Sequence, residues 1–147
     1  MRNVLGIIAA VGVLLAPRPA AAQAGDGHYK VIVNVNNPAA ALMASELSRI
    51  YLGTANVWPD RTLVLAIDQP EGSPVHASFV REILGKDSIS LSRYWEQAIF
   101  SGRAVPPRKL VNDLAIVDFV RSNPGAIAYV SASTVLPPDT KVLRIVR

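Results

Sequence analysis

The sequence contains no cysteine and only two histidines, His28 and His76. Without cysteine the chain has no disulfide, no thiolate nucleophile and no N-terminal cysteine that could carry a lipid anchor. Two histidines far apart in the sequence, with no cysteine beside them, do not make the ligand pattern of a zinc site. We therefore predict neither a bound metal nor a cofactor.

A strong excess of basic residues is also missing from the part that we expect to fold. The whole sequence has 15 Lys and Arg against 11 Asp and Glu, a formal net charge of +4. Arg2 and Arg18 precede residue 25, and without them the balance is 13 against 11. Binding of nucleic acids needs clustered basic residues, whereas here they are dispersed. We therefore predict no nucleic-acid partner.

Residues 1–24 have the layout of a secretory signal peptide. A basic start precedes an apolar run from Val4 to Ala16, and small residues follow it. That run is shorter than the roughly 20 residues that span a bilayer, and no second apolar run follows. Cleavage fits after Ala22 or after Ala24, and we favour the second position. We therefore expect a periplasmic or secreted protein whose residues 25–147 form a single domain.

Strand-like and helix-like segments alternate along this domain. Apolar alternation and short apolar runs predict strands at 29–35, 62–67, 126–130 and 141–146. Apolar residues at helical spacing predict helices at 43–52, 74–84, 90–100 and from 112 to the turn at 123–125. This order predicts an α/β domain with a mostly parallel sheet of about four strands flanked by about four helices.

The same spacing predicts which side chains face the core. On the helix at 90–100 these are Leu91, Tyr94, Trp95, Ala98 and Ile99, and on the last helix Leu114, Val117 and Val120. Trp58 is expected to pack over the edge of the sheet. Asn34 and Asn36 share the second face of the first strand, where we expect an exposed polar surface.

The helix at 74–84 has the clearest boundaries. Ser73 is suited to cap its N-terminus, Pro74 to be its first residue, and Gly85 to end it. The same stretch allows a second interpretation, because a helix N-terminus preceded by Gly72 and Ser73 can also bind a small anion.

Four segments, in order, resemble the phosphate-binding proteins of phosphate ABC transporters. They are "LSRIYLGTANVWPD", "EGS", "YWEQAIFSGRAVPP" and "NPGAIAYV". Full-length members of that periplasmic solute-binding superfamily (type II) have two lobes, and this chain resembles only the second. The resemblance implies a single-lobe, non-enzymatic binding domain associated with phosphate transport, whose ligand is a phosphate-like oxyanion.

The resemblance also implies where that ligand would bind. The family's anion loop reads R-S-D-G-S-G-T, and its arginine, serine, glycine and threonine contact phosphate. Gly72 and Ser73 match this pattern, and Glu71 stands where the family has Asp. Gln69 replaces the arginine, and Asn36 lies on the first strand, which in a clamshell runs near the cleft. The candidate ligand-binding residues are thus Glu71, Gly72, Ser73, Gln69 and Asn36.

The loop lacks several of the family's donors, because Pro74 and Val75 replace its second glycine and its threonine. Micromolar binding needs about 8 kcal/mol, whereas one hydrogen bond to a charged group supplies roughly 1.5–3 kcal/mol. We therefore predict that Ser73 acts chiefly as an N-cap, with a weak or altered anion site as the alternative. Arg61, Arg103 and Arg108 could add positive charge if they fold over the loop.

The missing lobe favours a second class of function. A lobe without its partner exposes the face that would line the cleft, and such a face suits self-association or docking to a membrane transporter or sensor. The sequence predicts no catalytic residue. Ser73 and His76 lack the nucleophile-elbow motif, and no carboxylate pair suited to acid–base chemistry is present.

Overall fold

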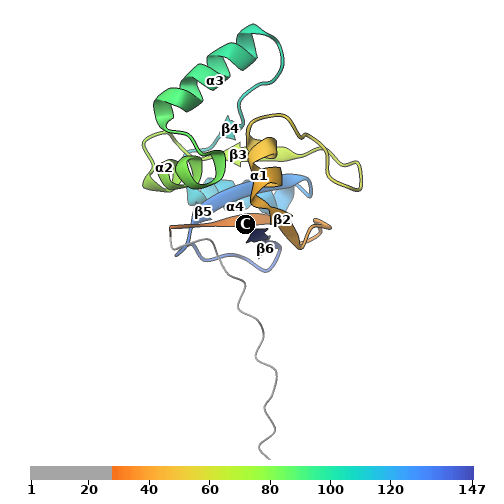
Figure 1. Cartoon of the computed structure of the whole chain (residues 1–147). Helices are drawn as coiled ribbons and strands as arrows, with labels where there is room; N and C mark the ends of the chain where they lie inside the picture. The colour runs from red at the N-terminus through yellow and green to blue at the C-terminus, as the bar shows by residue number, and fades with distance from the viewer. Residues whose placement is uncertain (1–27) are drawn as a thin grey trace, which may run out of the picture.

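The computed structural model describes residues 28–147 (Figure 1), so the predicted signal peptide lies outside the described residues. The strands are β1 (Tyr29–Asn34), β2 (Ala41–Met43), β3 (Leu65–Asp68), β4 (Arg108–Lys109), β5 (Ala126–Ser131), β6 (Thr140–Val142) and β7 (Arg144–Val146). The helices are α1 (Ala44–Tyr51), α2 (Pro74–Phe79), the π-helical turn η1 (Val80–Leu84), α3 (Ser88–Phe100) and α4 (Asp113–Ser122). No helix in this part of the chain is long and apolar enough to cross a membrane.

Five strands form the central sheet in the order β4-β3-β5-β1-β6, and β2 pairs with β7 in a small second sheet. The predicted α/β class, with four helices around a sheet, is confirmed. The prediction of a mostly parallel sheet holds for β4, β3 and β5. It is corrected at β1, which runs antiparallel to both β5 and β6. Before β4 and before β5, a helical segment carries the chain back to the end of the sheet where β3 begins, so these three strands are parallel. No helix lies between β5 and β6.

The sheet has a core on each face because successive residues of a strand point to opposite sides. On one face Val31, Val33 and Tyr129 pack with α1, α2 and η1. On the other face Ile32 and Val130 pack with α4. Trp58 is buried, at 3% exposed, but it lies at the amino end of the central strand β5 rather than at the sheet edge, and its Nε1–H donates to Gly125 O at 3.0 Å.

The segment 74–84 is helical throughout, as predicted. Ser73 is the N-cap, Pro74 is the first residue, and Gly85 ends the helix with a φ of 61°, in the left-handed region that favours glycine. The last turn is π-helical, a detail that apolar spacing does not reveal.

The structure corrects several details. The predicted strand 141–146 is two strands, because the buried Leu143 leaves the β6 pairing and its N–H donates to Val31 O at 2.9 Å. The strands β2 and β4 have three and two residues, too short to show a pattern. Asn34 is not exposed, since its amide donates to the carbonyl oxygens of Val120 and Arg121 at the end of α4.

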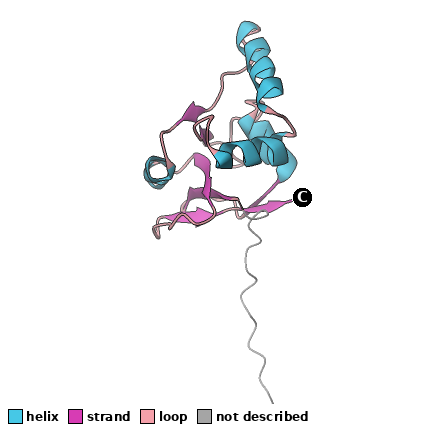
Figure 2. Cartoon of the chain, turned by 90° about the vertical axis from the view of Figure 1, so that its left-hand side faces the viewer, coloured by secondary structure: helices cyan, strands magenta, loops and turns pink. Residues whose placement is uncertain are grey.

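Two helices present faces that differ from the prediction. On α4, Leu114 is 70% exposed and Ile116 is buried in its place. On α3, Leu91 and Ala98 are buried as expected, but Ile99 is 54% exposed. The views in Figures 1 and 2 explain the second difference, because α3 projects from the body of the domain and has no layer on its outer side.

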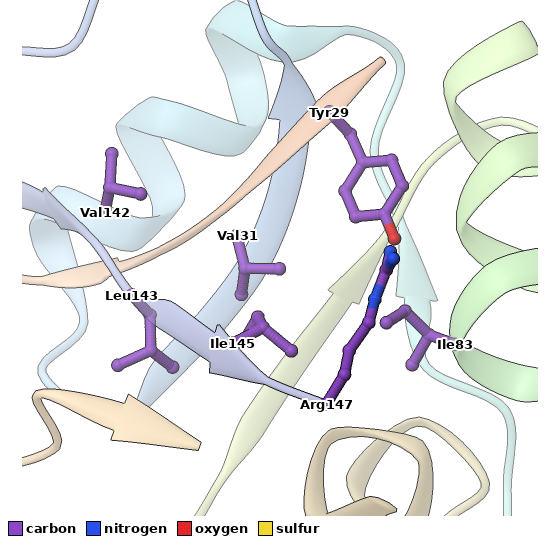
Figure 3. A pocket seen from close by; sticks show the side chains of 7 residues that line it. All are labelled: Tyr29, Val31, Ile83, Val142, Leu143, Ile145 and Arg147. Atoms are coloured by element: carbon purple, nitrogen blue, oxygen red, sulfur yellow. The ribbon is translucent and has the colours of Figure 1, made fainter. Parts of the chain in front are cut away.

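Arg147 lies against β1 and the helical turn η1. Figure 3 shows Arg147 beside Tyr29 and Ile83, around a cavity of about 20 Å³, which is room for one water molecule. Arg147 Nη2 and the Tyr29 hydroxyl both donate to Glu82 Oε2, at 3.4 and 3.2 Å. These contacts connect the end of β7 and the start of β1 to η1, which contains Glu82.

Candidate functional site

The carboxyl end of β3 opens into a groove between the start of α2 and the projecting helix α3. The groove has a volume of about 300 Å³. Its lining residues are Asp68, Glu71, His76, Ser88, Leu91, Ser92, Trp95, Glu96, Ile99, Pro106 and Lys109. A second hollow on the other side of residues 85–88 shares Glu71, His76 and Ser88 with it. Open α/β sheets commonly bind ligands at this end of their strands.

Asp68 and His76 line the floor of this groove, and both contact the buried Tyr129 hydroxyl. The Tyr129 hydroxyl donates to Asp68 Oδ1 in a short hydrogen bond. His76 Nδ1 lies 3.2 Å from the same carboxylate oxygen and 3.0 Å from the Tyr129 hydroxyl. The Tyr129 ring is fixed in turn by Phe79, which stacks on it with ring centroids 3.8 Å apart. The three polar groups are thus held rigidly by the aromatic core beneath them.

The network determines where the protons lie. Burial and the nearby Asp68 carboxylate raise the pKa of Tyr129 far above its usual value. The phenol therefore stays protonated and donates a hydrogen bond to Asp68. His76 Nδ1 then faces two groups that can accept, so Nδ1 carries a proton and donates.

The His76 ring lines the groove. Its Nε2 makes no hydrogen bond with another residue in 28–147, although His76 as a whole is only 7% exposed. The one fully buried side-chain polar atom without a partner in that range is Asp139 Oδ1, so Nε2 is open to solvent. Asp68 Oδ2 is open to solvent for the same reason. All the hydrogen bonds of this carboxylate go to Oδ1, and Oδ2 is not among the fully buried atoms without a partner.

Gln69 is turned away from the groove, into the protein. It is 3% exposed, and its amide donates to Asp113 Oδ1 at 2.6 Å and to Tyr129 O at 3.0 Å. Asp113 Oδ2 accepts from Ser131 N and from the Thr134 hydroxyl. Burial alone would raise the pKa of Asp113, but these hydrogen bonds outweigh burial and lower it below its usual value.

The loop that resembles the family's anion loop has the geometry of a helix cap. Ser73 Oγ accepts from His76 N at 3.4 Å, and Ser73 N donates to Pro70 O at 3.0 Å. Glu71 is exposed and forms an ion pair with Lys109, whose hydrogen bond lowers the pKa of the Glu71 carboxyl. A Cβ added at Gly72 would meet no atom within 4 Å, so the loop has space around it.

The structure brings four of the five candidate ligand-binding residues together. Gln69, Glu71, Gly72 and Ser73 lie in one turn after β3, with the Gln69 side chain buried. Asn36 is exposed and lies at the opposite end of the sheet, because β1 runs antiparallel to β5. Its backbone N–H donates to Asn34 Oδ1 at 2.9 Å.

The three arginines considered for this loop make other contacts or lie elsewhere. Arg103 Nε donates to Ser101 Oγ at 2.9 Å, and the Arg108 guanidinium lies over the Phe119 ring at 5.8 Å. Arg61 is in the turn after Trp58, which contacts Gly125 at the amino end of β5. The charge that does reach the loop comes from Lys109, which sequence reasoning missed because β4 has no recognisable pattern.

Asp68 and Tyr129 were also missed as site residues. An acidic residue directly after the apolar run of a predicted strand is a signal for Asp68, whereas Tyr129 is indistinguishable from a core residue in the sequence. In residues 28–147, no group of three or more His, Asp and Glu side chains is arranged to hold a metal ion.

Comparison with solved structures identifies the class of fold. The chain matches a phosphate transport receptor from Vibrio cholerae with a TM-score of 0.62 at 16% sequence identity, covering 80% of this chain and 46% of the receptor. It matches a phosphate ABC transporter substrate-binding protein from Clostridium perfringens, solved with bound phosphate, with a TM-score of 0.63 at 20% identity, covering 80% and 44%. PstS from Borrelia burgdorferi gives a TM-score of 0.61 at 11% identity, covering 80% and 47%.

The chain therefore has the fold of the phosphate-type periplasmic binding proteins, and it spans less than half the length of the proteins that it matches. No protein-family model matches the sequence, and no curated protein is similar to it.

Proposed function

We propose that this protein is an extracytoplasmic, non-enzymatic solute-binding domain, with its binding site in the groove at the carboxyl end of β3. The supporting observation is the His76 ring, which lines the groove and is held there by Asp68 and Tyr129. A rigid polar group on the floor of a partly apolar groove is the usual composition of a small-molecule site.

We further propose that phosphate is at most a weak ligand. Gln69 stands where the family's arginine would be, and its amide is already hydrogen-bonded to Asp113 and Tyr129. Ser73 Oγ caps the helix, and Pro74 has no N–H to donate. The remaining donors cannot supply the roughly 8 kcal/mol of a micromolar site.

A thermal-shift titration with phosphate, sulfate, molybdate and small carboxylates tests the phosphate proposal. Stabilisation by a ligand grows as RT ln(1 + [L]/Kd). We expect no rise in Tm with phosphate at micromolar concentrations and little at millimolar ones. A saturable shift at micromolar phosphate, abolished by Ser73→Ala, would contradict this part of the proposal.

A second candidate function, docking to another protein, is favoured by the end of α3. Ile99 is 54% exposed and Phe100 96%, at the end of a helix that projects from the domain (Figure 2), and Val105, in the loop after this helix, is 78% exposed. Exposed apolar clusters of this kind often mark contact surfaces. Because the chain corresponds to less than half of its structural neighbours, a second copy or a membrane transporter or sensor are the partners that we propose.

The oligomeric state tests the docking function. If this cluster joins two copies, sedimentation velocity will show a dimer, and Phe100→Ser will convert the dimer to a folded monomer. Val135→Ser is a matched control, because Val135 is 88% exposed and lies in the loop before β6. A wild-type monomer at high concentration leaves a membrane protein as the proposed partner, to be sought by cross-linking at position 100 in cells.

A further inference from the structure

We propose that the groove binds an organic cation, namely an ammonium or guanidinium group on an apolar body, rather than an oxyanion. This inference rests on the proposed solute-binding function and specifies the chemical class of the ligand. It follows from three features of the groove: the hydrogen-bonding groups on its floor, the charges around it, and the side chains of its wall.

The floor offers an acceptor. Asp68 and the His76 ring both line the groove, and His76 turns Nδ1 toward Asp68 and Tyr129. Asp68 uses only Oδ1 in its hydrogen bonds with Tyr129, His76 and the Gln69 backbone, so Oδ2 is left as an acceptor for a ligand. A carboxylate oxygen is matched by a ligand with several N–H groups, and an ammonium or guanidinium group has this property.

The charged side chains around the groove also favour a cationic ligand. Asp68, Glu71 and Glu96 line it, and Lys109 is the one lysine or arginine among its lining residues. Lys109 is already paired with Glu71, so its charge is largely compensated there. Asp68 and Glu96 are then left to set the potential of the groove. A cation is attracted to such a lining, whereas an oxyanion is repelled by it.

The wall of the groove accommodates an apolar body. Leu91, Trp95 and Ile99 of α3 line one side, and Pro106 lies beside them. Trp95 is partly exposed, so its ring is available for stacking or for contact with a cation. A volume of about 300 Å³ suits a ligand of roughly one ring with a short amine chain.

A titration with two probes of the same size and opposite charge tests the inference. Phenethylamine and phenylacetate share the ring and differ in the charged group, and inorganic phosphate serves as the third probe. We expect phenethylamine to raise Tm in a concentration-dependent manner, and phenylacetate and phosphate to have no effect at equal concentration. The amine should also shift the ¹⁵N resonances of the His76 ring.

Matched variants locate the effect. Glu96→Gln removes one groove charge on an exposed surface of α3 and should weaken amine binding by about two- to fivefold. Asp118→Asn removes the same charge on α4, on the other face of the sheet, and should leave amine binding unchanged. An equal effect of both variants would mean that the amine responds only to net charge, which would overturn the assigned site.

The two proposals fail in different ways. If phenylacetate or phosphate binds in the groove and the amine does not, the cation inference is wrong and the solute-binding function stands. If no probe of either charge shifts Tm or the His76 resonances up to 10 mM (a concentration on the order of weak-ligand dissociation constants), both proposals are wrong and the docking function is favoured.

Discussion

The helices α3 and α4 are similar in length and differ in what holds them in place. α4 places Ile116, Val117 and Val120 against the sheet, where each is almost fully buried. α3 is longer, at 13 residues against 10, and buries only Leu91 and Ala98. Packing of the core therefore explains α4, whereas much of the apolar surface of α3 has no structural role within the domain.

The difference shows how one domain can serve two purposes. The face covered by α4 is closed by its own core, which stabilises the fold. The projecting α3 forms one wall of the groove and presents apolar side chains at its far end. A site needs surface that the fold itself does not use, and α3 supplies that surface.

The largest expected difference between the two helices follows from truncating an isoleucine in each of them. Ile116→Ala should lower the free energy of unfolding by about 2–5 kcal/mol, because it leaves a cavity in a closed core. Ile99→Ala should change it by no more than about 0.5 kcal/mol, since Ile99 is 54% exposed. Urea denaturation of the two variants measures both values. Similar losses would mean that α3 is as well packed as α4.

The second prediction concerns Asp113, the first residue of α4. Asp113→Asn keeps one acceptor but turns an N–H group toward the Ser131 N–H and the Thr134 hydroxyl, so we expect a loss of about 1–3 kcal/mol at pH 7. The measurement is urea denaturation at a series of pH values.

The pH dependence of this loss has a definite sign. The pKa of Asp113 is lower in the folded protein than its ordinary value of 3.8, so ionisation favours folding. This contribution is fully present above pH 3.8 and disappears as the pH falls through the lower, folded pKa. The stability difference between wild type and Asp113→Asn should therefore shrink at acid pH. A difference that stays constant down to the acid-unfolding range would exclude this linkage.

The smallest expected effects come from the two N-caps. Asn112 Oδ1 accepts from Ala115 N at 2.9 Å on α4, and Asp87 Oδ1 accepts from Ser90 N at 2.7 Å on α3. Asn112→Ala should cost about 1 kcal/mol of global stability. Asp87→Ala should cost less globally but should speed amide hydrogen exchange within α3, because a weakly packed helix opens on its own. Equal global losses, with no local change in exchange, would show that α3 unfolds only with the rest of the domain.

Much of the fold could be predicted from local patterns. Ser73-Pro74 and Gly85 defined the boundaries of the helix at 74–84 because caps depend on backbone geometry within a few residues. The orientation of β1 could not be predicted in this way, since the partner of a strand is chosen by residues far along the chain. The exposure of Leu114 and Ile99 was missed for a related reason: helical spacing defines an apolar stripe, but not which part of it another element covers.

The residues of the candidate site could likewise be predicted only where their signal is local in the sequence. The turn at 71–73 was found because a helix cap and an anion loop share a local signature. Lys109 was missed because it joins the site through a two-residue strand, β4, that pairs with β3. Asn36 was placed with the loop by analogy, and the antiparallel β1 puts it at the other end of the sheet.

By itself the sequence determined the alternation of strands and helices, the cap at Ser73 and the absence of cysteine chemistry, because each depends on residues close together or on composition. Only the tertiary structure decided that Asp68, His76 and Tyr129 share one buried network and that Asp68 and His76 line a groove. Those three residues come from β3, α2 and β5. Their side chains come within hydrogen-bonding distance because the sheet pairs β3 with β5 and α2 follows β3.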